Sequence, residues 1–313
     1  MSESATDNLL RIRGERGFIP LLPQTLEKYR HFWPNHVANL SATVTPWQGE
    51  YNAWPEARVY NGWFECGDAE LYYSMIRTLR PNLIIEVGSG FCTRFAVDAC
   101  IKNGKGRMIC IDPNPRTDLP DFVRFERRFV QEIDLTLFEQ LEENDILFID
   151  TSHEAEEALY HYQILDCIAP GVMVHHHDFA FPNLPEWPEE NVIISYYMNH
   201  PGEWEGFTNN ALARDELGAE RYAALFPHYR HAPYRFPGSI YTRRRFLSER
   251  ERHYQELREE YTRTADYARH VVTEYGRAME RVRVLDEVVN RPSLAARALL
   301  KGIKGVVRRR DRS

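Results

Sequence analysis

A glycine-rich turn follows the apolar run LIIEV (residues 83–87), and its residue types suit the binding of a small charged ligand. Gly88 and Gly90 let the backbone turn tightly and approach a ligand closely. A helix that begins at this turn would also offer unpaired backbone N–H groups. Glu86 stands just before the first glycine, where its charge would repel a pyrophosphate but attract an ammonium group. The turn therefore predicts a site for a small ligand with a cationic group.

The spacing of this turn differs from the glycine pattern of dinucleotide-binding sites. That pattern has a third glycine three residues after the second, where this chain has Thr93. Asp112 ends the next strand-like run, RMICID, 24 residues after Gly88. A carboxylate at such a strand end has two acceptor oxygens that match the two vicinal hydroxyls of a ribose. The turn, which includes Ser89, and Asp112 together predict a site for a ligand that contains a ribose.

Two clusters of acids and histidines follow later strand-like runs. Asp150 ends DILFID and Asp178 ends GVMVHHHD, and the carboxyl ends of parallel strands share one edge of a sheet. Two carboxylates at that edge suit Mg²⁺, which prefers oxygen ligands and keeps several waters. His153 follows the first acid, and an imidazole with its ordinary pKa of about 6.5 suits removal of a hydroxyl proton near neutral pH. The alternative for His153 is a helix N-terminal position without a catalytic role.

The geometry of a strand determines which way each of the three histidines before Asp178 points. Successive side chains alternate between the two faces of a strand, so His175 and His177 share one face and His176 lies on the other. At most two of the three can therefore face the same site.

These residues need a framework of strands and helices, and the chain predicts one. Strand-type apolar runs alternate with helical patterns: strands at 83–87, 107–112, 145–150 and 171–178, and helices at 69–80, 93–102 and 153–168. Such alternation predicts βαβ units, and the continuous apolar runs indicate strands that helices cover on both faces. The segments ERYAALFPHYRHA and SIYTRRRF are expected to supply a helix and a closing antiparallel strand pair. The expected fold class is α/β, a Rossmann-like parallel sheet with an antiparallel closing pair and a long C-terminal helix.

The motifs resemble those of the class I S-adenosylmethionine-dependent methyltransferases, over residues 66–245. E-x-G-x-G at the first strand, an acid at the second and FID at the fourth carry this resemblance. The segments IIEVGSGFCTRFA, FIDTSHEAEEALYHYQIL and APGVMVHHHD resemble a branch with D-G-S-H and H-D motifs, which often modifies sugars or small metabolites. The resemblance implies S-adenosylmethionine as cofactor and an adenine pocket near residues 129–131. It also implies cofactor contacts at Glu86, Gly88 and Gly90 for the methionine part and at Asp112 for the ribose, with Ser89, Thr93 and Asp150 beside them.

The resemblance extends to the metal-dependent catechol-type O-methyltransferases. Those enzymes have an acid at the position of Asp150, a second at that of Asp178, and a general-base lysine where this chain has His153. They follow the second acid with an amide ligand, whereas this chain has Phe179. A bound Mg²⁺ would thus need another ligand, which could be His177, His153 or further water. We expect the metal at Asp150, Asp178 and His177, with His153 as the best candidate for the base and His177 as a second catalytic candidate.

The segments outside 66–245 differ in character. Residues 1–65 are rich in aromatic residues and proline, and predict either a cap over the ligand or a packing layer. Residues 246–290 carry a seven-residue repeat over 254–289, which predicts a coiled coil and a homo-oligomer, with one long helix packed on its own domain as the alternative. Residues 291–313 form a basic amphipathic tail, suited to peripheral contact with an anionic membrane surface or else simply solvated.

Composition narrows the classes of partner and location. Hydrophobic residues make up 43% and charged residues 27% of the chain, which is ordinary for a globular protein. The formal net charge of -7 gives no electrostatic reason to expect a nucleic acid partner. There is no basic start followed by an apolar run, no stretch of roughly 18 apolar residues, and no CxxC pair among five cysteines. We therefore expect a cytoplasmic protein, at the inner face of the membrane if the tail binds there.

These features together predict an S-adenosylmethionine-dependent O-methyltransferase of a small hydroxylated acceptor, with a sugar or glycoconjugate favoured. Two alternatives stay open. A nucleotide-dependent oxidoreductase could use a similar sheet, although Thr93 and Glu86 disagree with its glycine pattern. A non-catalytic scaffold could retain the same fold, although the acids and the histidine expected for catalysis are all present.

Overall fold

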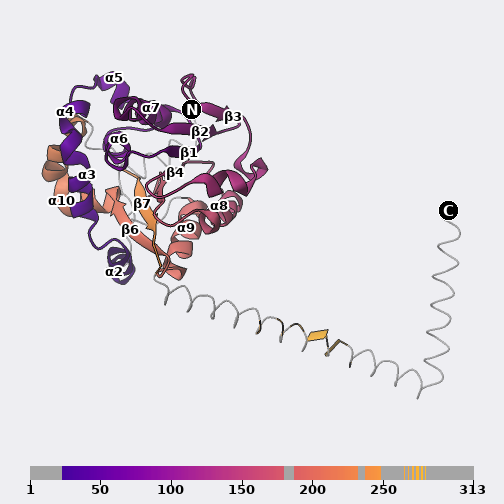
Figure 1. The fold of residues 1–313 in the computed structure, drawn as a ribbon. Helices are drawn as coiled ribbons and strands as arrows, with labels where there is room; N and C mark the ends of the chain where they lie inside the picture. Colours follow the sequence, from indigo (N-terminus) through magenta and orange to yellow (C-terminus); the bar gives the residue numbers. More distant parts are fainter. Residues whose placement is uncertain are drawn as a thin grey trace, which may run out of the picture. The chain divides into compact units, whose positions relative to one another are not determined.

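A computed structural model describes residues 23–179, 187–231 and 237–247, together with eight separate positions between Thr264 and Met279 (Figure 1). The chain divides into two compact units, Met1–Phe246 and Leu247–Ser313. All the strands among the described residues belong to the first unit, which also carries the candidate site.

Seven strands form a single sheet in the order β3-β2-β1-β4-β5-β7-β6. Their bounds are β1 Leu83–Val87, β2 Arg107–Ile111, β3 Arg124–Glu126, β4 Ile146–Ile149, β5 Met173–His176, β6 Trp204–Asn209 and β7 Ile240–Arg244. The strands from β1 to β5 pair in parallel, and β7 is antiparallel to both of its neighbours. The predicted α/β class, with its parallel sheet and antiparallel closing pair, is confirmed.

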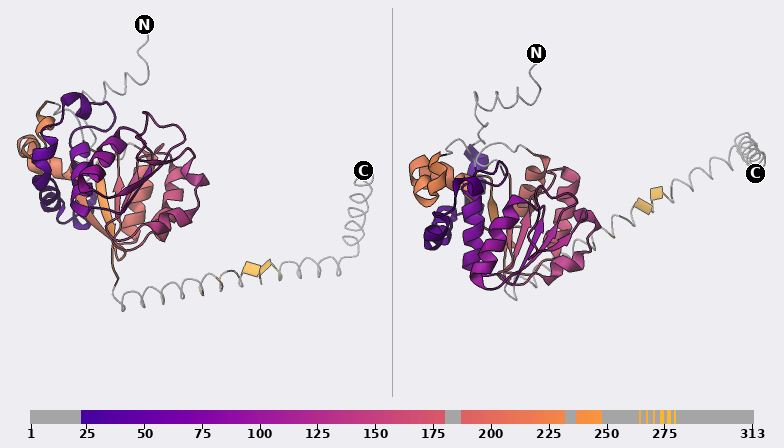
Figure 2. Two further views of the ribbon diagram at one scale, coloured as in Figure 1. Left: turned by 45° about the horizontal axis from the view of Figure 1, so that its top comes forward. Right: turned by 90° about the horizontal axis from the view of Figure 1, so that it is seen from above.

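Helices cover both faces of this sheet, as the figures show (Figure 2). The α-helices among the described residues of the first unit are α2 Pro23–Phe32, α3 His36–Val44, α4 Gln48–Tyr51, α5 Glu56–Val59, α6 Asp68–Leu79, α7 Phe91–Asn103, α8 Ala155–Cys167, α9 Pro188–Asn199 and α10 Asn210–Leu225. Short 3₁₀ turns lie at Thr45–Trp47, Val130–Glu132, Leu135–Gln140 and Pro227–His231. Helices α3, α6, α7 and α10 enclose one core with side chains such as Ile84 and Phe148, and α8 and α9 enclose the other with Ile85 and Leu147. This two-sided burial explains why the central strands are mostly apolar, with Glu86 in β1 and two histidines in β5 as exceptions.

The sequence analysis did not predict two of the strands, β3 and β6. β3 is only three residues long, and β6 contains Gly206, which breaks the apolar pattern. A Cβ at Gly206 would lie 2.3 Å from the backbone oxygen of Phe32, so a glycine is needed where α2 packs closely on this strand.

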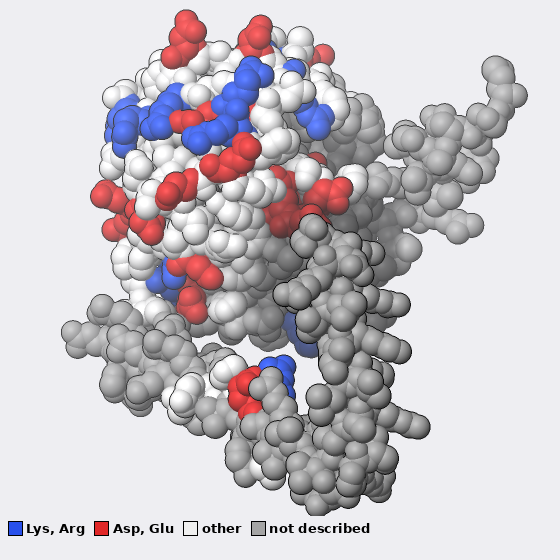
Figure 3. All heavy atoms as spheres, turned by 90° about the vertical axis from the view of Figure 1, so that its right-hand side faces the viewer, with Lys and Arg blue, Asp and Glu red and all other residues white. Residues whose placement is uncertain are grey.

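The sheet ends at β3 on one side, and this edge carries charges of both signs. Arg124 and Arg128 form ion pairs with Glu126, at 2.6 and 2.9 Å. Figure 3 faces the side where β3 lies in Figure 1, and its Lys and Arg side chains are interspersed with Asp and Glu. Charged side chains of this kind discourage the pairing of an exposed edge strand with another chain.

The aromatic N-terminal segment mostly forms a packing layer. Trp33, Tyr51 and Trp54 are buried in the two cores. Trp63, by contrast, is 58% exposed. The prediction that residues 1–65 form a cap over the ligand stays a prediction. Within this segment it applies best to Trp63, because that side chain is exposed.

The C-terminal predictions fall almost entirely outside the described residues. Of the predicted heptad seam only Thr264 is described, and residues 291–313 lie wholly outside. Among the described residues, no helix combines the length and the apolar character that crossing a bilayer requires.

Candidate active site

The candidate site lies where the order of the strands reverses. β1 and β4 are neighbours at the centre of the sheet, and the chain proceeds from them toward opposite edges. Ligands of open α/β sheets bind beyond the carboxyl ends of the strands at such a point. The glycine turn follows β1, and Asp150 follows β4. The glycine turn and Asp150, which belong to two separately predicted groups of site residues, therefore lie at the same edge of the sheet.

A cleft of about 400 Å³ opens at this point. Its lining combines the glycine turn, acids, one histidine and several aromatic side chains. The lining residues are Trp63, Phe64, Gly88, Ser89, Gly90, Phe91, Cys92, Asp112, Arg116, Asp150, Thr151, Ser152, His153, Asp178 and Trp187. Most residues predicted to contact the cofactor lie here, whereas the predicted adenine pocket at 129–131 is not part of this lining.

Asp112 is fixed by backbone groups on both sides. The backbone N–H groups of Ser89 and Asn114 donate to its two carboxylate oxygens, at 2.9 and 2.7 Å. Each carboxylate oxygen can accept a second hydrogen bond. Asp112 therefore remains able to bind hydroxyl groups in the cleft while it holds the glycine turn in place.

Glu86 and Thr93 lie beneath the turn and do not line the cleft, and their predicted contact with the cofactor stays a prediction. Glu86 has no exposed surface, and its carboxylate accepts hydrogen bonds from Tyr72, Thr93 and Cys110. Burial raises the pKa of Glu86 to about 7, although these three hydrogen bonds act in the opposite direction. The Thr93 hydroxyl also accepts the N–H of Gly90. Both side chains thus support the turn from within the core.

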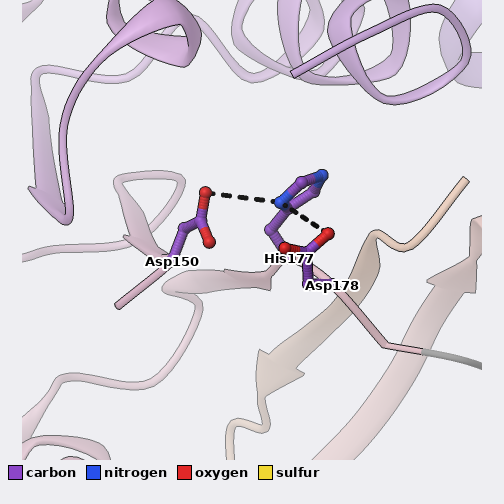
Figure 4. A group of neighbouring side chains, drawn as sticks. All are labelled: Asp150, His177 and Asp178. Atoms are coloured by element: carbon purple, nitrogen blue, oxygen red, sulfur yellow. Dashed lines mark ion pairs between the residues drawn. The ribbon is translucent and has the colours of Figure 1, made fainter. Parts of the chain in front are cut away.

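Asp150, His177 and Asp178 converge as the predicted metal ligands should (Figure 4). One potential ligand atom from each lies within 4.8 Å of the others. Nδ1 of His177 lies 3.3 Å from an oxygen of Asp150 and 3.3 Å from one of Asp178. This nitrogen is buried and makes no hydrogen bond in the described part of the chain. A buried nitrogen without a hydrogen bond, between two carboxylates, fits a divalent cation.

The other two histidines of the triplet, His175 and His176, are buried in the core. The predicted alternation of the three side chains between the two faces of the strand is confirmed. His175 and His177 both contact the ring of Phe64. His176 lies on the opposite face, where its ring shares a hydrogen bond of 2.8 Å with the hydroxyl of Tyr197. Only His177 reaches the cluster of acids.

His153 faces the same acids from the other side. Its Nε2 lies 3.7 Å from Asp150 and 3.5 Å from Asp178, and its Nδ1 lies 2.8 Å from Glu189. Burial lowers the pKa of His153, but hydrogen bonds to Asp178 and Glu189 and nearby carboxylate charges outweigh it and raise the pKa to about 10. The ordinary imidazole pKa that made His153 attractive as a base therefore does not hold beside the carboxylates of Asp150, Asp178 and Glu189. A cation at the acids would offset that negative charge.

Backbone strain coincides with this site. His153 and Asp178 both have positive φ, at 62° and 61°, which few residues other than glycine adopt. Such conformations cost free energy and persist where the surrounding structure enforces them, often at functional sites. The strain is consistent with a constrained arrangement of these two side chains.

Two buried acids near the site were not found from the sequence. Oδ2 of Asp68, at the start of α6, lies 3.6 Å from Nε2 of His177, and Glu189, in the first turn of α9, contacts His153. Acids in a first helical turn are common for electrostatic reasons alone, so neither carried a distinguishing signal.

Parts of the chain are similar to known proteins. Residues 85–179 match a family model described as a methyltransferase domain. A stretch of 94 residues is 42% identical to an uncharacterized protein of Archaeoglobus fulgidus, which amounts to 28% of this chain and 42% of that protein. The chain thus spans less than half of that relative's length.

Solved structures also align with the chain. An O-methyltransferase from Bacillus cereus, in complex with SAH, is 15% identical, with a TM-score of 0.36 over 75% of this chain and 96% of that one. The O-methyltransferase TomG from Streptomyces achromogenes, in complex with SAM, is 13% identical, with a TM-score of 0.38 over 72% and 100%.

The family match and the sheet order define the class. The order places an antiparallel β7 between β5 and β6, whereas the common dinucleotide-binding order 3-2-1-4-5-6 has no such strand there. Residues 85–179 match a methyltransferase domain, and the chain resembles the class I S-adenosylmethionine-dependent methyltransferases.

Proposed function

We propose that the protein transfers a methyl group from S-adenosylmethionine to an oxygen of a small hydroxylated acceptor, with a sugar or glycoconjugate favoured. The observation that carries this proposal is the meeting of two features in one cleft. The glycine turn and Asp112 line this cleft, and so do Asp150, His153 and Asp178.

The cofactor would lie along the glycine turn. Gly88 and Gly90 leave its backbone open to close approach, and Asp112 offers carboxylate oxygens for the ribose hydroxyls. When bound, S-adenosylmethionine supplies an electrophilic methyl carbon: the acceptor oxygen bonds to that carbon, and the electron pair of the broken carbon–sulfur bond stays on sulfur. Glu86 supports this turn from beneath, through the hydroxyl of Thr93.

A divalent cation such as Mg²⁺ would be held by Asp150, Asp178 and His177. When bound, it would orient acceptor oxygens and lower the pKa of a hydroxyl group. The acceptor proton would pass to Nε2 of His153, which lies within 3.7 Å of both acids. His177 would act through the cation and not as a second base, since its Nδ1 is directed between the acids.

Aromatic side chains would receive the acceptor. Trp63 and Trp187 line the cleft and are 58% and 41% exposed. Indole faces pack against sugar rings and aromatic rings alike, which suits either type of acceptor. The guanidinium of Arg116 lies 3.6 Å from the ring centre of Trp63, so this tryptophan is held at the mouth of the cleft.

Isothermal titration with S-adenosylhomocysteine, with and without Mg²⁺, tests the proposal. We expect micromolar binding, followed by S-adenosylhomocysteine release when S-adenosylmethionine is supplied with hydroxylated acceptors. Absence of binding in both conditions would overturn the proposal and favour a nucleotide-dependent oxidoreductase, which titration with NADH would reveal. Binding without turnover on any acceptor would favour the non-catalytic scaffold.

A further inference from the structure

A single buried carboxylate connects two histidines behind the cleft. Glu189 is 3% exposed and lies in the first turn of α9. Its Oε2 is 2.8 Å from Nδ1 of His153, and its Oε1 is 3.3 Å from Nδ1 of His161 on α8. Neither Glu189 nor His161 lines the cleft, so their role must pass through His153.

We infer that Glu189 is a positioning residue, which holds His153 so that Nε2, and not Nδ1, receives the acceptor proton. This inference rests on the proposed methyltransferase function. A carboxylate can only accept hydrogen bonds, so the shared proton lies on Nδ1 of His153. In the neutral ring the lone pair is then on Nε2, the atom that faces Asp150 and Asp178.

The surroundings of His153 show why the ring needs such support. The residue belongs to no helix or strand and has a positive φ of 62°. Its ring stacks on Trp187, with ring centres 5.3 Å apart and an angle of 18° between the planes. Stacking fixes the plane of the ring but leaves a half-turn about Cβ–Cγ, which would exchange Nδ1 with Cδ2 and Nε2 with Cε1. The hydrogen bond to Glu189 removes that freedom.

A second contact joins the same two residues. The backbone N–H of Glu189 donates to the backbone oxygen of His153, at 3.4 Å. The start of α9 is therefore tied to both the main chain and the ring of His153. His161, with no exposed surface, places a second imidazole against the other carboxylate oxygen and so helps to retain the charge in the core.

The matched control is Asp166, another carboxylate that joins α8 to α9. Oδ1 of Asp166 accepts a hydrogen bond of 2.6 Å from the hydroxyl of Tyr196, near the opposite ends of these helices. Asp166→Asn removes the charge of this carboxylate and keeps an oxygen that can accept from Tyr196, and it should leave His153 unaffected.

The experiment compares Glu189→Ala, Glu189→Gln and Asp166→Asn in the full chain by ¹⁵N NMR of labelled histidines. The His153 signals are assigned by their absence in His153→Gln. We expect a protected Nδ1 proton on His153 in the wild type and in Asp166→Asn. It should be lost in Glu189→Ala and partly restored in Glu189→Gln, whose amide oxygen can still accept it.

Measuring the affinity for S-adenosylhomocysteine distinguishes a failure of this inference from a failure of the proposed function. If all variants bind it as the wild type does and only Glu189→Ala loses the Nδ1 signal, the positioning role stands. With an acceptor in hand, Glu189→Ala should then lower kcat by about tenfold or more at unchanged KM. The inference is overturned if the Nδ1 proton signal of His153 persists in Glu189→Ala, or if it is missing in the wild type. Failure of the wild type to bind S-adenosylhomocysteine refutes the proposed function itself.

Discussion

Gly88 stands so close to Asp150 that a Cβ atom at residue 88 would lie 1.7 Å from the backbone oxygen of Asp150. The backbone at Gly88 also has a positive φ of 86°. The turn proposed to bind the cofactor and the strand end proposed to bind the metal are therefore in direct contact. Disturbance of one should disturb the other.

Gly88→Ala should destabilise the protein and abolish binding of S-adenosylhomocysteine. Overpacking and the positive φ each oppose a side chain, and together should cost about 3 kcal/mol or more. Urea unfolding measures the first effect and calorimetry the second. Gly49→Ala is the control, because a Cβ there meets nothing within 4 Å. Equal stability of the two variants would contradict the close contact.

Asp112→Ala should remove most of the affinity for S-adenosylhomocysteine. Hydrogen bonds to a charged group contribute about 1.5–3 kcal/mol each, so loss of the pair to a ribose corresponds to a factor of about 100 or more. The backbone N–H groups of Ser89 and Asn114 would also lose their acceptor. Calorimetry with Asp121→Ala, an exposed acid on a nearby loop, provides the control. Unchanged affinity of Asp112→Ala would remove this residue from the cofactor site.

Asp178→Asn should weaken the binding of a divalent cation by about tenfold or more, because an amide replaces one of two carboxylate ligands. Mn²⁺ is a convenient probe, since its electron paramagnetic resonance signal reports the free ion. Affinity for S-adenosylhomocysteine alone should remain within a small factor of the wild-type value. If wild type and variant bind Mn²⁺ equally, Asp178 is not a ligand.

The sequence predicted the fold better than it predicted the directions of side chains. Strand runs, the glycine turn and the acids at strand ends are local patterns, and the sheet brings Asp150 and Asp178 together by topology alone. The inward direction of Glu86 was hidden because LIIEV is apolar on both faces, so no alternation marks which face meets the core. Glu189 reaches His153 only because α9 packs beside α8, and no local pattern encodes a contact across 36 residues.

A buried pair that does not line the cleft should make stability depend on pH. Nδ1 of His228 lies 2.9 Å from Glu70, and this hydrogen bond raises the pKa of His228 above its ordinary value, against the opposing effect of burial. Other groups that face His228 are the backbone oxygen of Trp54 and the charge of Glu56.

A raised pKa in the folded state stabilises the protein below the unfolded pKa of about 6.5, and this contribution is lost as pH rises through the higher folded value. The free energy of unfolding should therefore decline between pH 6 and pH 9 more steeply in the wild type than in His228→Asn. Urea titrations across that range measure both slopes. Parallel curves would show that the pair contributes no pH dependence.

Removal of residues 248–313 should lower the oligomeric state without affecting the cleft. The first compact unit, Met1–Phe246, contains the sheet, both cores and every residue of the candidate site, so the shortened chain should fold and bind S-adenosylhomocysteine. The predicted heptads at 254–289 are the segment expected to join copies of the chain. Light scattering should give the mass of an oligomer for the full chain and of a monomer after the deletion. If the full chain and the shortened chain have the same oligomeric state, the repeat does not join copies of the chain. The alternative of a single long helix then gains support.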